Sequence, residues 1–175
     1  VDQVPLPVVP GPEVLIRDNA ALTIGLDVQA NAVQIRGLAI HGFGTGTTTG
    51  DIRVGNATNL TGVQIVGNVI GSRPDALALP AVVAQRTGGN GVVVNGPDAG
   101  TIQNNVMAFA ARNGLAIRGA ANSWTVTGNE FRGNAIAAGT NVIDSSSAAS
   151  SASTTVSAIG WNIFPSTPLR AKIGR

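Results

Sequence analysis

An eight-residue pattern that recurs along the chain restricts the possible folds more than any other feature. The segments GTIQNNVM at 100–107 and WTVTGNEF at 124–131 both follow it. Each has polar residues at positions two and four, a β-branched residue at three, Gly or Asn at five, Asn at six and a bulky apolar residue at eight. The two copies start 24 residues apart, and a second apolar segment, LAIR at 115–118, lies between them. A fixed period of this kind, made of short strands and Gly or Asn corners, indicates a solenoid in which successive turns stack.

Three further segments follow the pattern more loosely: VQIRGLAI at 33–40, VQIVGNVI at 63–70 and VSAIGWNI at 156–163. Under simple strand alternation the eighth residue would face away from the first and third, so the backbone has to bend between them. Gly and Asn tolerate the left-handed backbone angles that such a bend requires. We therefore expect coil corners at the residues in position five, which are Gly37, Gly67, Asn104, Gly128 and Gly160.

With these repeats the chain resembles the right-handed parallel β-helix family, the pectate-lyase-like solenoids of secreted bacterial and phage proteins, over about residues 22–164. The resemblance implies an all-β fold, a right-handed parallel β-helix of about five to six coils with loop insertions. The same coil carries lyases, hydrolases, tailspikes, adhesins and passive scaffolds, so the resemblance indicates architecture rather than activity.

The resemblance also implies an internal asparagine ladder at position six, where stacked amides bond to one another and to the corner backbone. Its members would be Asn68, Asn105 and Asn129. Leu38 and Trp161 stand at this position in the outer copies, so we expect the ladder only in the middle coils.

Three regions follow from the repeats. Residues 1–13 form a proline-rich N-terminal segment, and four prolines there exclude a helix and favour an extended path. This segment either packs on its own solenoid and covers the first coil, or reaches a neighbouring subunit. Residues 14–164 form the parallel β-helix, and residues 165–175 form an irregular tail.

The largest departure from the period is an insertion at 71–90. We expect its apolar segment 81–84 to be buried. The insertion either pads one side of the coil or carries recognition.

Charge and composition exclude several classes of protein. The sequence pI is about 10.4 but the net charge is only +2, and the basic residues are scattered, so we expect no nucleic-acid partner. No apolar run is long enough to span a membrane. Cysteine is absent, which excludes disulfides and Cys-ligated metal. The chain begins at Val1 rather than Met, and together with the resemblance this favours an exported protein, extracellular or on the cell surface, with a signal peptide removed.

Catalytic carboxylates on neighbouring coils would stand in the same or adjacent columns, because equivalent positions are about 4.8 Å apart. The nine acidic residues form no such pair, so we assign no catalytic, metal or cofactor-binding residue. The lone histidine, His41, is expected near the surface at a corner. A speculative glycan-contact set consists of Arg36, His41, Arg118 and Arg132, and a solvated face is the alternative for the arginines.

The sequence thus favours a non-catalytic, extracellular structural or adhesive solenoid. A stack of coils has two open ends whose unpaired backbone invites association, so we expect a homo-oligomer or polymer joined through the ends, as in a filament or surface layer, or a part of a larger surface protein. The alternative hypotheses are a polysaccharide lyase or hydrolase and a carbohydrate-binding β-helix, both with polysaccharide as the partner.

Overall fold

A computed structural model of the 175-residue chain describes residues 12–18, 22–55, 59–75, 77–96, 99–118 and 123–136, and the backbone of 143–144. The fifth copy of the repeat, with Gly160 and Trp161, lies outside the described residues. So do most of the N-terminal segment and the whole of the 165–175 tail.

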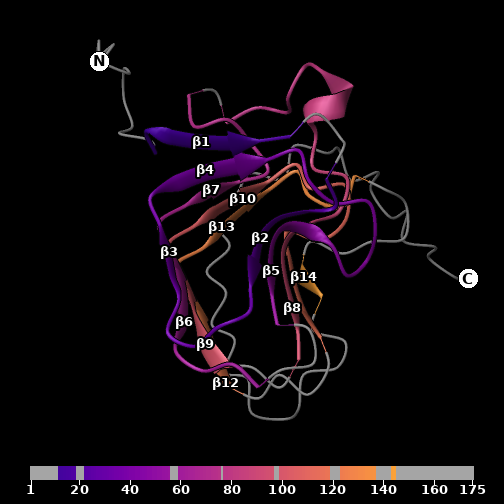
Figure 1. Ribbon diagram of the computed structural model, residues 1–175. Coiled ribbons are helices and arrows are strands. Elements are labelled where there is room, and N and C mark those ends of the chain that lie inside the picture. The colour runs from indigo at the N-terminus through magenta and orange to yellow at the C-terminus, as the bar shows by residue number, and fades with distance from the viewer. Residues whose placement is uncertain are drawn as a thin grey trace, which may run out of the picture.

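The described strands form three parallel sheets that the chain visits in turn (Figure 1). Sheet A contains β1 (Val14–Arg17), β4 (Leu38–His41), β7 (Val69–Ile70), β10 (Val106–Ala108) and β13 (Glu130–Arg132). Sheet B contains β2 (Ile24–Val28), β5 (Gly50–Val54), β8 (Asn90–Asn95), β11 (Leu115–Arg118) and β14 (Ile143–Asp144). Sheet C contains β3 (Gln34–Arg36), β6 (Val63–Val66), β9 (Ala99–Gln103) and β12 (Ser123–Thr127).

The sequence repeat explains the register of these sheets. Its first four positions lie in or beside sheet C, its last two lie in sheet A, and the corner between them holds positions five and six. Position three stacks as Ile35, Ile65, Ile102 and Val126, and position eight stacks as Ile40, Ile70, Met107 and Phe131. Equivalent residues of successive turns therefore lie directly above one another, and all but Phe131 in these two columns are buried.

The predicted all-β parallel solenoid is confirmed, but the described residues make about four turns instead of five to six. The fifth copy of the repeat lies outside the described residues, so its coil is not among these turns. The corner residues of the other four copies are 30, 37 and 24 residues apart along the chain, so two of the three intervals contain loop insertions.

The core is thin and filled mainly by Val, Ile and Leu, with Trp124 as its largest side chain. A Cβ atom added to Gly100, its partner in the turn before, would lie 2.9 Å from the Trp124 ring. Gly100 thus provides the room that the indole needs, which is why a large aromatic side chain fits into a narrow coil.

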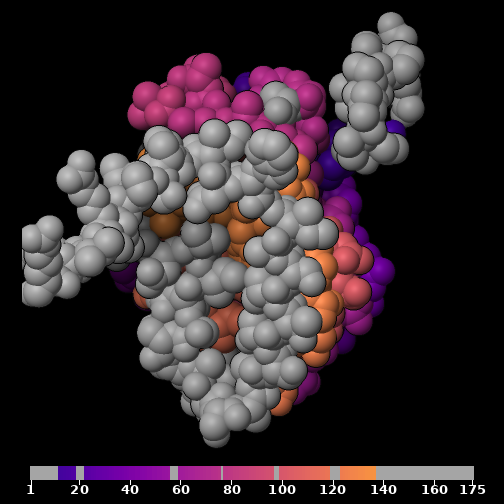
Figure 2. All heavy atoms as spheres, turned by 180° about the vertical axis from the view of Figure 1, so that it is seen from behind, coloured from indigo at the N-terminus to yellow at the C-terminus, as the bar shows by residue number. Residues whose placement is uncertain are grey.

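The insertion runs along the outer side of sheet A (Figure 1) and forms a ridge in the space-filling view (Figure 2). Ala39 and Val69 alternate with inward-facing residues of this sheet, yet they are 0% and 8% exposed. The prediction that segment 81–84 is buried is wrong, because Val82 and Val83 are 54% and 72% exposed. This segment forms a single 3-10 turn, η1 (Val83–Gln85), on the outside of the coil, where no facing layer covers its apolar side chains.

Candidate functional site

The first turn of the solenoid presents three strand edges at one end of the stack. β1, β2 and β3 are the terminal strands of sheets A, B and C, so in the described part of the chain each pairs with another strand on one side only. We call this end the N-terminal edge. The backbone groups on the outer side of an edge strand can pair with another strand, which makes such an edge a place for association.

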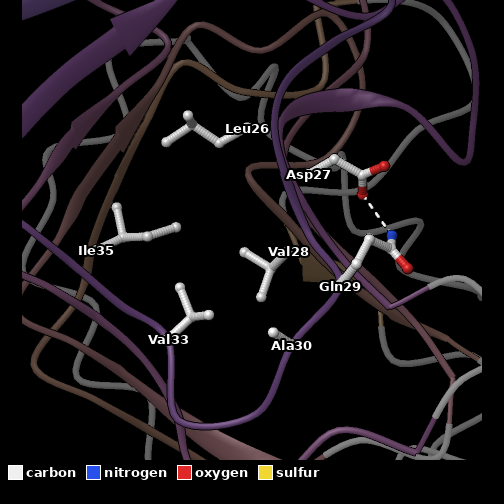
Figure 3. Close-up of a pocket in the computed structure, with 7 residues that line it drawn as sticks. All are labelled: Leu26, Asp27, Val28, Gln29, Ala30, Val33 and Ile35. Carbon is white, nitrogen blue, oxygen red and sulfur yellow. Dashed lines mark hydrogen bonds between the residues drawn. The ribbon is translucent and has the colours of Figure 1, made fainter.

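A hollow of about 420 Å³ lies at the N-terminal edge between β2 and β3. Its apolar lining consists of Leu26, Val28, Ala30, Val33 and Ile35, and the larger of these side chains point toward one another (Figure 3). Asp27 and Gln29 point away from the hollow and are joined by a 2.7 Å hydrogen bond between Gln29 Nε2 and Asp27 Oδ1 (Figure 3). The inside of the first turn thus offers an apolar surface, and its polar residues lie outside.

Exposed apolar side chains also lie on and beside the strands of this end of the stack. Val14 at the start of β1 is 55% exposed, Leu22 before β2 is 58% exposed, and Leu15 is 36% exposed. In the next turn, by contrast, Ile52 and Val54 of sheet B are fully buried. The N-terminal edge therefore leaves in contact with solvent the kind of side chain that a further turn would cover.

A second region of interest is a cluster of buried polar side chains where sheets A and B meet. We call it the polar corner and define it by His41, Asp51 and Thr87, all 0% exposed. The His41 ring bonds through Nδ1 to the Gln85 carbonyl oxygen at 2.7 Å. Thr87 Oγ1 donates to Asp51 Oδ2 at 2.7 Å. His41 was expected at the surface, and the structure corrects this because the insertion lies over it.

Burial sets the protonation of the polar corner. It raises the pKa of the Asp51 carboxyl well above its usual value, and the hydrogen bonds from Thr87 and Phe43 offset only part of this effect. It lowers the pKa of His41 below its ordinary value. The bond to Gln85 opposes that shift, and the charges of Arg17 and Arg73 add to it. Both side chains are therefore stabilised in their uncharged forms.

Position six of the repeat carries a row of hydrogen-bonded amides. Asn105 Oδ1 accepts from the backbone N–H and from Nδ2 of Asn68, both at 2.9 Å. Asn129 Oδ1 accepts from the same two groups of Asn105, at 3.0 and 2.9 Å. Asn68 Oδ1 in turn accepts from the Leu38 N–H at 3.0 Å. The row thus connects the corner backbone of four successive turns.

The sequence did not predict a second group of buried amides beside the polar corner. Asn113 Nδ2 donates to Asn90 Oδ1 at 3.0 Å, and Asn90 Nδ2 bonds to the carbonyls of Thr47 and Thr49. Asn134 bonds across turns to the Ala110 N–H and the Met107 carbonyl. The pair Asn-Gly directly before the apolar segments at 92–94 and 115–117 is the signal that could have identified the first two.

The expected corner residues in the described range have left-handed backbone. Their φ angles are 63° for Gly37, 66° for Gly67, 54° for Asn104 and 63° for Gly128. Gly160 lies outside the described residues. These corners shape the coil and offer no chemical group, so their role is architectural.

The speculative glycan-contact residues do not form one site. Arg36 lies on sheet C, Arg118 on sheet B and Arg132 on sheet A, where it pairs with Glu130, and His41 is buried. No three His, Cys, Asp or Glu side chains among the described residues are grouped so that they could hold a metal ion. The described part of the chain also contains no helix that could span a lipid bilayer.

Comparisons with protein-family models, with curated proteins and with solved structures found no match for this chain.

Proposed function

We propose that the chain is a non-catalytic structural β-solenoid module that assembles end to end, with its N-terminal edge docking onto a second copy. The observation that carries this proposal is the combination of three strand edges with an apolar hollow at one end of the stack. The resemblance to secreted pectate-lyase-like solenoids supports an extracellular place for such a module, as a filament, a surface layer or a part of a larger surface protein.

A second copy is the partner that the geometry favours. Every described turn already stacks in register on another turn of the same chain, with apolar residues of position three over one another. A turn of the same repeat therefore has the right strand spacing and the right apolar columns to extend sheets A, B and C. Such a contact joins two different surfaces of the subunit, so it does not close on itself and can propagate.

The experiment compares the assembly of the whole chain with that of surface variants, by light scattering after size exclusion and by electron microscopy. Val14→Lys with Leu22→Lys places charge on exposed apolar positions of the N-terminal edge, which should prevent docking without disturbing the core. Val83→Lys is the control, because it places the same charge on another exposed valine, which lies on the insertion and is 72% exposed.

We expect concentration-dependent oligomers or filaments of the wild-type chain and of Val83→Lys, and monomers of the double variant. A wild-type chain that stays monomeric over a wide concentration range would contradict the proposal. So would a double variant that assembles like the wild type.

A further inference from the structure

The side chains of His41 and Asp51 are buried although they do not point into the coil. His41 alternates with the inward-facing Ile40 on β4, and Asp51 alternates with Ile52 on β5, so both side chains leave the solenoid on its outer side. They are nevertheless 0% exposed, because the insertion and the loop at 42–49 cover them. If the insertion moved away, both groups would meet water.

The bonds of His41 suit an uncharged ring. Gln85 O can only accept a hydrogen bond, so Nδ1 carries the proton, and the neutral ring has a bare lone pair at Nε2. Nε2 is buried and has no hydrogen-bond partner among the described residues. Protonation would add an N–H at that atom with no acceptor, and the positive charge would face Arg17 on β1 and Arg73 in the insertion.

The bonds of Asp51 also suit an uncharged group. Its donors are the Phe43 N–H at 3.2 Å and the Thr87 hydroxyl, which itself accepts from the Gly42 N–H at 3.2 Å. Within the described residues, no ion pair reaches this carboxylate: Arg73 pairs with Asp75, and Arg86 bonds to the Pro80 carbonyl. An ionised Asp51 would therefore be a buried charge held by two neutral donors.

We propose that His41 and Asp51 form a latch, which holds the insertion on the solenoid only while both side chains are uncharged. The insertion contacts these residues through Gln85, which bonds to His41, and Thr87, which bonds to Asp51. Gln85 and Thr87 are two residues apart in the chain and close to the site where the insertion returns to β8. This inference concerns the insertion and does not depend on end-to-end assembly.

The latch predicts two opposite pH limbs in the opening of the insertion. The pKa of His41 is lower in the closed state than in the open state, so between these two values a fall in pH favours the open state, in which the imidazolium is solvated. The pKa of Asp51 is higher in the closed state than in the open state, so between these two values a rise in pH favours the open state. Each limb has a limiting slope of roughly a tenfold change in the opening equilibrium per pH unit.

The experiment measures amide exchange by NMR across the pH range, expressed as protection factors so that the intrinsic pH dependence of exchange is removed. The Gly88 N–H bonds to Phe43 O and the Ala111 N–H bonds to Thr87 O, so both report on the closed insertion. The Ile102 N–H in sheet C reports on the solenoid itself. Where the two limbs overlap they oppose each other, so each limb is read from a variant that keeps only one of the two groups, and protection at Ile102 should stay unchanged throughout.

Three variants separate the limbs. Asp51→Asn keeps only the His41 limb, so protection at Gly88 and Ala111 should rise with pH. His41→Asn keeps only the Asp51 limb, so this protection should fall as the pH rises. Asp75→Asn removes an exposed carboxylate of the same insertion and should leave both limbs in place. Flat profiles in both latch variants, slopes of the same sign in both, or parallel changes of protection at Ile102 would overturn the latch.

A direct titration in the wild-type chain covers the case in which a variant fails to fold. His41 is the only histidine, so its ring Cε1–H signal is unambiguous, and the Asp51 carboxyl can be followed by its ¹³C shift. The latch requires the pKa of His41 to lie below, and the pKa of Asp51 to lie above, the ordinary value of that side chain, and a shift of either in the other direction would also overturn the proposal.

Discussion

Removal of the Asn105 side chain tests how much the amide row contributes to the stability of the solenoid. Asn105 is the middle member, and its side chain makes four hydrogen bonds. Oδ1 accepts from the N–H and Nδ2 of Asn68, and Nδ2 donates to the Ile65 carbonyl at 2.8 Å and to Asn129 Oδ1 at 2.9 Å. Asn105→Ala deletes all four and leaves the buried Asn68 N–H without its acceptor.

The expected loss follows from the number of bonds. A neutral hydrogen bond contributes about 1 kcal/mol net, and an orphaned buried group costs about 1–3 kcal/mol, so Asn105→Ala should lower the free energy of unfolding by about 3–5 kcal/mol. In a chain of this length, 1 kcal/mol corresponds to about 2–4 °C in Tm. We therefore expect Tm to fall by about 10 °C or more.

Urea unfolding followed by tryptophan fluorescence measures the effect, because Trp124 is only 3% exposed in the native chain. Asn31→Ala is the matched control: Asn31 Oδ1 also accepts an N–H from the next turn, that of Thr61 at 2.9 Å, but this bond is exposed. The control should lose about 1 kcal/mol or less. If Asn105→Ala lost no more than Asn31→Ala, the reasoning on the buried row would be refuted.

Two other substitutions test the corners and the surface charges. Gly71→Ala would place a Cβ atom 1.8 Å from the Ala108 carbonyl oxygen at a φ of +85°, so it should destabilise the fold far more in thermal unfolding than Gly37→Ala, whose Cβ meets nothing within 4 Å; equal Tm losses would contradict this. Arg53 donates to Asp27 at 2.9 Å and holds the pKa of that carboxyl below its usual value, so the pair stabilises the protein above the unfolded-state pKa and this contribution is lost as the pH falls through the native-state pKa. Asp27→Asn should cost less than about 1 kcal/mol in urea unfolding at neutral pH, because the pair is partly exposed, and should cost nothing in acid.

The sequence predicts the coil because the coil depends on local requirements that repeat. Each turn needs an apolar residue at position three, a residue that tolerates a positive φ at position five and another apolar residue at position eight. These requirements recur in every turn, so each copy, such as 63–70 or 124–131, supports the same prediction of a coil. The row at Asn68, Asn105 and Asn129 lies at a fixed place in the same pattern, which is why those residues could be named from the sequence.

The polar corner could not be predicted in this way, because it depends on contacts that occur once. His41 meets Gln85, which is 44 residues later, and Asp51 meets Thr87, which is 36 residues later. No periodicity relates these residues. The sequence placed His41 at a corner, but whether a corner residue is buried depends on the path of the insertion, and no pattern in the sequence describes that path.

The position of the ionisable residues follows from the stacking itself. An inward column is shared by every turn, so a charge there would have apolar neighbours above and below it, whereas amides can bond to one another along the column. A buried ionisable group is better tolerated on the outer side, where a loop that differs from turn to turn can cover it. In this chain the longest described excursion covers both His41 and Asp51. The repeat therefore determines how turns stack and where another copy could dock, while the non-repeating insertion is the part in which a response to pH can evolve without disturbing the coil.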